Sequence, residues 1–393
     1  MKQRRFAVTA IAMAALVAAS GCQGAAQEDT MRIGAVLSLT GKFAPSAKYV
    51  EEGYKYWASQ VNKSGGVDGK KVKLVIRDDK SDPATSANLA RKLVEQEDVS
   101  FILGPYGSGS TDTMAAVVES LQVPMLGTIA SEAAVWEKRR LKWTFQAFPS
   151  STYDHEAFLA VAEEEGYERI TIINEEIGFS VAAAKWAKKE AAKHGMKVQS
   201  LSYPSDVQSF SSIVAKMKSF KPDAISMGGY YEPSITLTKE MVSKKLNVSA
   251  YHFIQSSDGV TAEALGDNTE GVLGRSSWEP QLPTKGNKKF VDGYQAMFDR
   301  EPSYHSAAAY GAGELAQKSL EAGGDDADKV REYLATKEVD TVAGTYKVNA
   351  KGQQTGLRYV GTQWQDGKKE IIWPEEDVTG DVIAPKPKWS AAT

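Results

Sequence analysis

Short apolar segments alternate with longer amphipathic segments along most of the chain, from about residue 31 onward. Short apolar runs bounded by polar residues, glycine or proline predict strands, whereas apolar positions repeated every three to four residues or so predict helices. In the first part of the chain the predicted strands are 32–39, 72–76, 100–103 and 124–127, and the predicted helices run from about 42 to 62 and from 83 to 96. This order predicts a parallel sheet with helices on both of its faces.

The same alternation begins again near residue 169, which indicates a second α/β unit of similar size. Its predicted strands are 169–174, 198–203, 224–227 and 250–255, and its predicted helices are 181–194, 210–220 and 234–245. Further helices are predicted at 287–298, 305–321 and 326–337, followed by short strands within 341–373. Two such units in tandem predict two lobes with a cleft between them, and parallel sheets bind ligands at the carboxyl ends of their strands.

The loop after the strand at 100–103 is rich in glycine and hydroxyl residues and leads into a helical pattern, ILGPYGSGST over 102–111. Free N–H groups at a helix N-terminus bind anions. A phosphate-binding loop would place Lys before Ser110 and Thr111, and neither this Lys nor a G-x-G-x-x-G sequence is present. Two interpretations stay open: a site for a small, singly charged anion such as a carboxylate, or a simple turn in which one of these hydroxyls caps the helix.

The N-terminal residues have the features of an export signal. Basic residues are followed by an uncharged, Ala-rich stretch over 6–19, too short to span a bilayer comfortably, and then by Ala19-Ser20-Gly21-Cys22. Residues 1–22 are therefore predicted to be a lipoprotein-type signal ending at Cys22, which is lipidated, with a polar linker over 23–30. Ala19 stands where Leu is usual in such signals, so cleavage near residue 25 or 26 and a free periplasmic protein is the alternative.

Composition and charge exclude several classes of protein. The chain is 25% charged and 42% hydrophobic, which argues against disorder and against a polytopic membrane protein. Removing residues 1–21 takes away three positive charges and changes the net charge from −3 to −6. A nucleic-acid partner would require clustered positive charge, so none is expected.

No arrangement of residues in the sequence predicts catalysis, a metal or a cofactor. There is no G-x-S-x-G sequence, and the only cysteine, Cys22, lies in the signal. The residues Asp78, Asp79 and Asp82 resemble the start of a calcium loop without its Gly and its final Glu, and are better explained as a strand end and a helix N-cap. The four histidines are scattered without metal-ligand spacing: His155, His194, His252 and His305.

Several of these segments together identify a family. The relevant stretches are IGAVLSLTG (33–41), VNKSGGVDGKKV (61–72), RDDKSDP (77–83), ILGPYGSGST (102–111), RITIIN (169–174) and MGGYYEP (227–233). With them the mature chain resembles the branched-chain-amino-acid type of substrate-binding proteins of ABC transporters, which have a type I periplasmic-binding-protein fold. The resemblance implies two Rossmann-like lobes with parallel sheets, joined by three crossovers, that close around a small ligand and deliver it to a membrane permease.

The resemblance and the element pattern together suggest where the lobes divide. Lobe I is expected over 31–149 and 278–340, lobe II over 150–277 and 341–375, and residues 376–393 are expected to be a loose tail. The protein is expected to be a monomer that is anchored through lipid and exported to the periplasm or cell surface. The alternative to transport is a ligand-binding sensory module for a receptor or regulator, because the same fold serves both purposes.

The resemblance places a carboxylate site on lobe I and an amine site on lobe II. Ser108, together with Ala130 and Ser131, matches the positions that bind the ligand's α-carboxylate, and a buried carboxylate needs several donors. Asp258 matches the acidic residue that binds the α-amine, although Asp replaces the usual Glu. Tyr230 matches a ligand-contacting position. The alternatives are an Asx-turn at Asp258, a core aromatic at Tyr230, and a carboxylate or amide ligand without an amine.

Other positions depart from the family pattern. A family Tyr is replaced by Phe179, and a pocket Trp aligns with Ser46. We expect Tyr106 and Tyr153 to enlarge the aromatic lining of the pocket. The side-chain pocket is therefore expected to differ from a leucine pocket and to admit a larger or more polar ligand.

Overall fold

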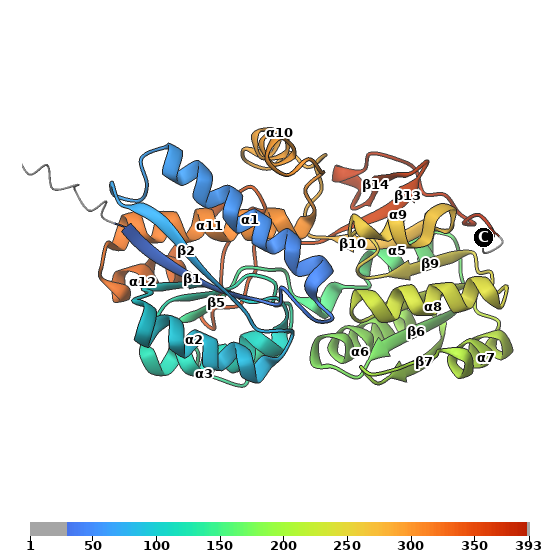
Figure 1. Cartoon of the computed structure of the whole chain (residues 1–393). Coiled ribbons are helices and arrows are strands. Elements are labelled where there is room, and N and C mark those ends of the chain that lie inside the picture. The colour runs from blue at the N-terminus through green and yellow to red at the C-terminus, as the bar shows by residue number, and fades with distance from the viewer. Residues whose placement is uncertain (1–29, 391–393) are drawn as a thin grey trace, which may run out of the picture.

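A computed structural model describes residues 30–390 and arranges them as two α/β lobes that lie side by side (Figure 1). The first lobe contains a parallel five-stranded sheet in the order β2-β1-β3-β4-β5. Its strands are β1 (Thr30–Leu37), β2 (Lys71–Asp78), β3 (Phe101–Leu103), β4 (Met125–Gly127) and β5 (Thr144–Gln146). Its helices are α1 (Ala44–Lys63), α2 (Pro83–Glu97), α3 (Ser108–Leu121), α4 (Ala134–Glu137), α10 (Asn287–Phe298), α11 (Tyr304–Gly323) and α12 (Ala327–Thr336).

The second lobe contains a seven-stranded sheet in the order β14-β13-β10-β9-β8-β6-β7. Its strands are β6 (Arg169–Glu175), β7 (Lys197–Tyr203), β8 (Ala224–Gly228), β9 (Ala250–Phe253), β10 (Val272–Ser276), β13 (Val360–Gln365) and β14 (Lys368–Trp373). Its helices are α5 (Glu156–Glu164), α6 (Gly178–Lys193), α7 (Ser211–Phe220), α8 (Tyr231–Ser243) and α9 (Val260–Leu265), with short 3₁₀ turns η1 (Ser151–Tyr153), η2 (Gly266–Thr269) and η3 (Glu375–Asp377). The sheet is parallel except that β13 and β14 join it as antiparallel strands.

The local signals in the sequence explain how these elements begin. Asp82 caps α2 by accepting a hydrogen bond of 2.7 Å from the N–H of Thr85, and Pro83 follows at the first helical position, as predicted. Apolar side chains of α1 and α11 pack on one face of the first sheet, and those of α2 and α3 pack on the other. Both faces of this sheet are therefore covered by helices. In the described part of the chain, no helix is long and apolar enough to cross a membrane.

The chain passes between the lobes three times, after β5, after β10 and after β12. The hairpin of β11 (Val339–Thr341) and β12 (Gly344–Tyr346) packs with the first lobe, because the side chains of Val342 and Tyr346 belong to its core. The expected division between residues 340 and 341 therefore falls inside this hairpin. The third passage lies after residue 346.

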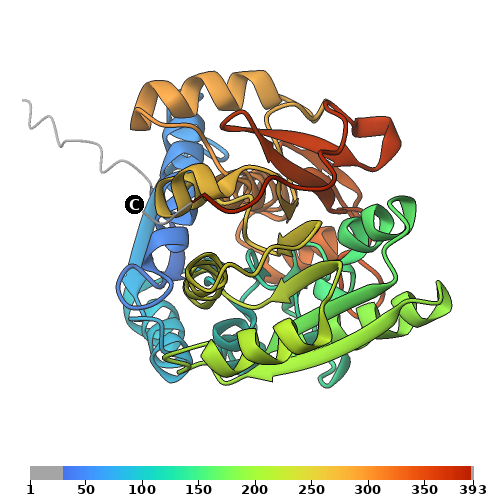
Figure 2. The ribbon, with the colours of Figure 1, turned by 90° about the vertical axis from the view of Figure 1, so that its right-hand side faces the viewer.

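The C-terminal segment is packed against the second lobe, so the expectation of a loose tail is wrong for its described residues. The N–H of Lys386 donates to the carbonyl of Ser249, and the Trp389 ring packs on Tyr251 with a centroid distance of 5.7 Å. The indole N–H of Trp389 also donates to the carbonyl of Leu246. Figure 2 shows this segment, in red, against the second lobe. The aromatic contact and the main-chain bonds explain why the Pro- and Lys-rich composition did not produce a free end.

Candidate functional site

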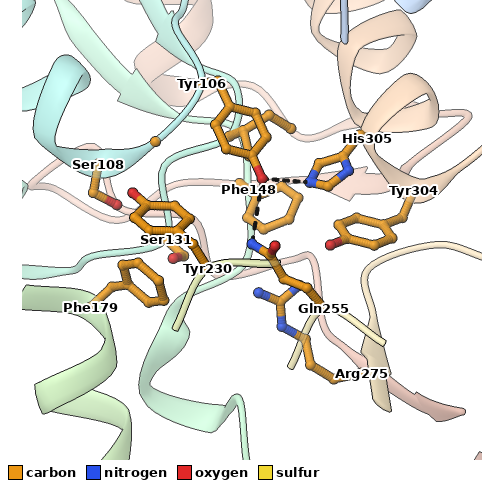
Figure 3. A pocket seen from close by; sticks show the side chains of 12 residues that line it. Tyr106, Ser108, Ser131, Phe148, Phe179, Tyr230, Gln255, Arg275, Tyr304 and His305 are labelled. Atoms are coloured by element: carbon orange, nitrogen blue, oxygen red, sulfur yellow. Dashed lines mark hydrogen bonds between the residues drawn. The ribbon is translucent and has the colours of Figure 1, made fainter. Parts of the chain in front are cut away.

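The two lobes line a cavity of about 20 Å³, measured as the space open to the centre of a water-sized sphere (Figure 3). Its lining comes from the segments that follow β3, β4, β6, β8 and β9, from β10 itself, from the start of α11, and from the first crossover. This is the edge of the sheets at which parallel α/β proteins bind ligands. The lining residues are Tyr106, Gly107, Ser108, Ile129, Ser131, Phe148, Phe179, Tyr230, Gln255, Arg275, Tyr304 and His305.

The first-lobe side of the cavity is formed by the N-terminus of α3. The preceding Gly107 has φ of +91°, and a Cβ at this position would lie 3.0 Å from the hydroxyl oxygen of Tyr230, so glycine is required there. The Ser108 hydroxyl accepts a hydrogen bond of 3.1 Å from the N–H of Glu132 and lines the cavity with Ser131. The first N–H groups of a helix have no acceptor within the helix. Hydroxyls and N–H groups thus face the cavity together, as an anion requires.

Aromatic rings from both lobes meet near the N-terminus of α3. The ring of Phe43 in the first lobe lies 4.4 Å, between centroids, from that of Tyr230 in the second. Tyr230 also contacts Phe179 edge-on at 5.2 Å and faces Tyr106 at 6.5 Å. The contacts of Tyr230 with Phe43 and Tyr106 cross between the lobes and bring them together around the cavity. Burial raises the pKa of Tyr230, so its hydroxyl stays neutral and can donate or accept a hydrogen bond.

A buried arginine lies at the other end of the cavity. Arg275 in β10 is only 4% exposed, and its Nε donates to Asp154 Oδ1 at 2.9 Å. Its guanidinium stacks on the ring of Tyr359 at 4.4 Å. Burial raises the pKa of Asp154 to about 6, although the charge of Arg275 acts in the opposite direction. Because the Nη1 atom of Arg275 is buried and has no hydrogen-bond partner in the described part of the chain, it is available to a group inside the cavity.

A hydrogen-bonded group beside the cavity connects the lobes. The carboxylate of Asp258, in the second lobe, accepts a hydrogen bond of 2.9 Å from the hydroxyl of Ser46 and lies 3.4 Å from His305 Nδ1, both in the first lobe. Burial alone would raise the pKa of Asp258, but the neighbouring imidazole of His305 and the hydrogen bond from the Ser46 hydroxyl hold this pKa below its ordinary value. Asp258 therefore contributes a negative charge to the contact between the lobes.

Comparison with known proteins identifies this arrangement. A family model described as "Periplasmic binding protein" matches residues 30–369. The chain belongs to this family. Among its relatives, this periplasmic binding protein is 25% identical to the Leu/Ile/Val-binding protein homolog 7 of Brucella suis, over 96% of this chain and 98% of the relative. It is 26% identical to the Leu/Ile/Val-binding protein homolog 8 of Brucella abortus, over 88% and 91%. The branched-chain-amino-acid type expected from the sequence is therefore confirmed.

Solved structures confirm the type I fold of this periplasmic binding protein. The substrate-binding protein LivJ from Streptococcus pneumoniae, in complex with isoleucine, has a TM-score of 0.81 at 20% identity, covering 88% of this chain and 100% of that one. A solute-binding protein from R. palustris in complex with benzoate has a TM-score of 0.79 at 18% identity, covering 92% and 98%. At these identities the likeness shows the fold, with its two lobes and parallel sheets.

The structure brings together most, but not all, of the residues that sequence reasoning selected for this binding protein. Ser108, Ser131, Tyr106, Tyr230 and Phe179 all line the cavity. Because they come from both lobes, the cleft between the lobes is where these predicted residues meet. Their binding roles stay predictions.

Four selected residues lie outside the lining. The side chains of Ser46 and Asp258 are buried beside the cavity and bond to each other. Ala130 is buried against Trp136, and its carbonyl accepts from Gln146 Nε2. Tyr153 is 48% exposed, packs on Trp186 at 5.5 Å, and lines a separate hollow. The expectation that Tyr153 lines the ligand pocket is therefore wrong, because the η1 turn directs its ring away from the cleft.

Sequence reasoning missed several lining residues, of which Arg275 is the most informative. The strand VLGRS (272–276) is otherwise uncharged, and a single arginine within a buried strand was a detectable signal. Its partner Asp154 lies 121 positions away, so the pairing could not be predicted locally. The other lining residues that were missed are Gly107, Ile129, Phe148, Gln255, Tyr304 and His305.

Proposed function

We propose that this protein is the extracytoplasmic solute-binding component of an ABC importer and that it binds a small carboxylate between its lobes. The main support is the cavity, where Ser108, Ser131 and the N-terminus of α3 face aromatic rings from the opposite lobe. The amino-acid-binding names of the Brucella relatives support an amino acid or a related acid as the ligand. The protein is proposed to act as a monomer that passes its ligand to permease subunits and does not change it chemically.

The proposed carboxylate site consists of neutral donors. The Ser108 and Ser131 hydroxyls and the N–H groups of α3 would share the negative charge, and the positive end of the helix dipole adds to their effect. Neutral donors and a dipole hold an anion without a permanent ion pair. Such a site allows release to a transport partner.

Ligand binding is coupled to closure of the lobes. The contacts between Phe43 and Tyr230 and between Ser46 and Asp258 exist only when the lobes lie close together. A ligand that touches both sides of the cavity has a higher affinity for this closed form and shifts the equilibrium toward it. The permease would then recognise the closed, loaded protein.

A binding screen tests this proposal directly. Amino acids and small carboxylates are added to the purified protein. Thermal shift measures the change in unfolding temperature, and titration calorimetry measures binding. A ligand at 100 times its Kd should stabilise the folded protein by about 2.7 kcal/mol. Recovery of one unchanged ligand per chain by mass spectrometry supports a binding protein. Chemical turnover of that ligand, or no response to any carboxylate, would contradict the proposal.

The importer role has its own test. A strain that lacks this protein should lose uptake of the ligand found by calorimetry, and the intact chain supplied in trans should restore uptake. Normal uptake together with loss of a transcriptional or chemotactic response to the same ligand would favour the sensory alternative.

The amine site is tested by replacing Asp258 with Asn. If Asp258 binds an ammonium group, D258N should weaken the binding of leucine and glutamate much more than that of 4-methylpentanoate and glutarate. These two acids have the same carbon skeletons without the amine. Calorimetry on these matched pairs makes the measurement. An equal loss of affinity for all four ligands would instead indicate that Asp258 acts in lobe closure, through its contacts with Ser46 and His305. Unchanged affinity for every amino acid that binds would eliminate the amine site.

The predicted lipid anchor at Cys22 lies outside the described residues. We expect C22A to leave folding and ligand binding intact and to move the protein from the membrane fraction to the soluble fraction. Cell fractionation with immunoblotting measures this, with the unmodified chain as the control. Membrane association that does not change in C22A would show that the lipoprotein signal was misassigned.

A further inference from the structure

The end of the cavity opposite Ser108 contains two buried donors without partners. Arg275 Nη1 and the hydroxyl of Tyr304 both lack a hydrogen-bond partner among residues 30–390, and both residues line the cavity. Arg275 comes from β10 in the second lobe, and Tyr304 comes from the start of α11 in the first. Figure 3 shows the two side chains on the same side of the cavity, away from Ser108 and Ser131. Buried polar groups are nearly always hydrogen-bonded, so two such donors on one wall indicate a partner inside the cavity.

The surroundings of Arg275 favour an anion as that partner. Only its Nε is bound to Asp154, although a guanidinium has five N–H donors. The rings of Phe148, Tyr304 and Tyr359 lie 4.4–5.8 Å from the guanidinium carbon and keep water away from it. In such surroundings a planar anion binds strongly to the guanidinium, and a carboxylate matches the spacing of its N–H groups.

The end of the cavity at Arg275 is separate from the proposed carboxylate site at Ser108. Ser108 and Ser131 belong to loops after β3 and β4, whereas Arg275 lies in a strand of the other lobe. Aromatic side chains, among them Tyr106, Phe148 and Tyr230, line the space between the two ends. The space between the two ends is thus mostly aromatic, with Gln255 and His305 as polar side chains beside the Tyr106 hydroxyl.

We propose that the solute carries a second carboxylate at the end away from Ser108, and that Arg275 and Tyr304 bind it. This inference rests on the proposed function, in which Ser108 and Ser131 bind the first carboxylate. The ligand class is therefore a dicarboxylate, whose carbon skeleton packs against the aromatic rings. Because its two ends contact both lobes, a dicarboxylate bridges the cleft and stabilises the closed form.

The first experiment uses the unmodified protein and ligand pairs that differ only at one acid group. Titration calorimetry compares succinate, glutarate, adipate, terephthalate and glutamate with their monoamides, glutamine being the monoamide of glutamate. The amide keeps the shape and removes the charge. We expect the diacid of best-fitting length to bind at least about tenfold more tightly than its monoamide.

Variants then assign this preference to the two residues. Y304F removes only a hydroxyl and should reduce affinity for the diacid about tenfold and affinity for the monoamide by less, because a hydrogen bond to a carboxylate is stronger than one to a neutral amide. The double variant D154N/R275Q removes both charges of the buried pair and should abolish the preference for the diacid. Circular dichroism and thermal melting verify that each variant is folded. The Y304F result and the unmodified-protein result remain informative if the double variant does not fold.

The outcomes separate this inference from the proposed function. Monoamides or monocarboxylates that bind as tightly as the diacids would overturn the inference and leave the proposed function intact. A preference for diacids that survives in both variants would overturn the assignment to Arg275 and Tyr304. If no carboxylate of any kind binds, the proposed function fails, and the inference fails with it.

Discussion

Replacing Ser108 with Ala should weaken the binding of a small carboxylate by about 10- to 150-fold. The Ser108 hydroxyl lines the closed cavity and is only 3% exposed. A hydrogen bond from such a donor to a charged group contributes roughly 1.5–3 kcal/mol, which corresponds to this range of affinities. Calorimetry with the ligand from the binding screen measures the loss. The backbone N–H groups of α3 remain in S108A, so binding should be weakened and not abolished.

Ser110 provides a matched control on the same helix. Its side chain is equally buried, but its hydroxyl lies 2.9 Å from the hydroxyl of Ser86, and the residue does not line the cavity. S110A should therefore bind the ligand with unchanged affinity. Thermal melting of both variants checks that the loop after β4, which bonds to Ser108 through Glu132, is still in place. If S108A bound every ligand as tightly as the unmodified protein, the carboxylate would have to lie elsewhere.

Local sequence signals predicted the strand-to-helix turn on the first-lobe side of the site, and the family resemblance selected Ser108 within that turn. The glycine and hydroxyl residues of 104–111 follow a buried strand and precede a helix, and these features depend only on neighbouring residues. Gly107 shows the physical reason, because its positive φ favours glycine in this turn. The helix N-terminus and its serine could therefore be placed before the structure was considered.

Features that depend on distant contacts could not be predicted in the same way. The direction of the Tyr153 ring is set by the η1 turn and by packing on Trp186 in a helix further along the chain. The C-terminal residues have a polar, Pro-containing composition, and only the surface of the second lobe provides the site where Trp389 packs. The hairpin 339–346 likewise joins the first lobe through contacts with its core. In each case the position of the segment depends on tertiary packing, which the local composition does not specify.

Replacing Arg275 with Met should destabilise the fold by about 3–5 kcal/mol, because it leaves the carboxylate of Asp154 buried and without its charged partner. Asp154 is almost completely buried, and Arg275 is the charged group that donates to it, from Nε at 2.9 Å. Urea unfolding of R275M measures the change. R91M, which breaks an exposed ion pair with Glu95, is the control and should change stability by less than about 1 kcal/mol.

The pH dependence of R275M identifies the buried carboxylate as the cause. Burial already raises the pKa of Asp154 to about 6, above its ordinary value of 3.8, and the loss of Arg275 should raise this pKa further. A group whose pKa is higher in the folded state stabilises the fold below its unfolded pKa, and this contribution is lost as pH rises through the folded pKa. R275M should therefore recover stability relative to the unmodified protein as the pH falls from above 6 toward 4.

The double variant D154N/R275M completes the test. Without either charge, its stability at neutral pH should exceed that of R275M, since a buried pair replaced by neutral residues costs far less than one that loses a single partner. The pH-dependent recovery should also disappear, because Asn does not titrate. A recovery of the same size in the double variant would mean that another buried acid, such as Glu279, causes the pH dependence. An R275M protein as stable as the unmodified one would show that Asp154 is already protonated at neutral pH, and that the guanidinium is held in place chiefly by the aromatic rings around it.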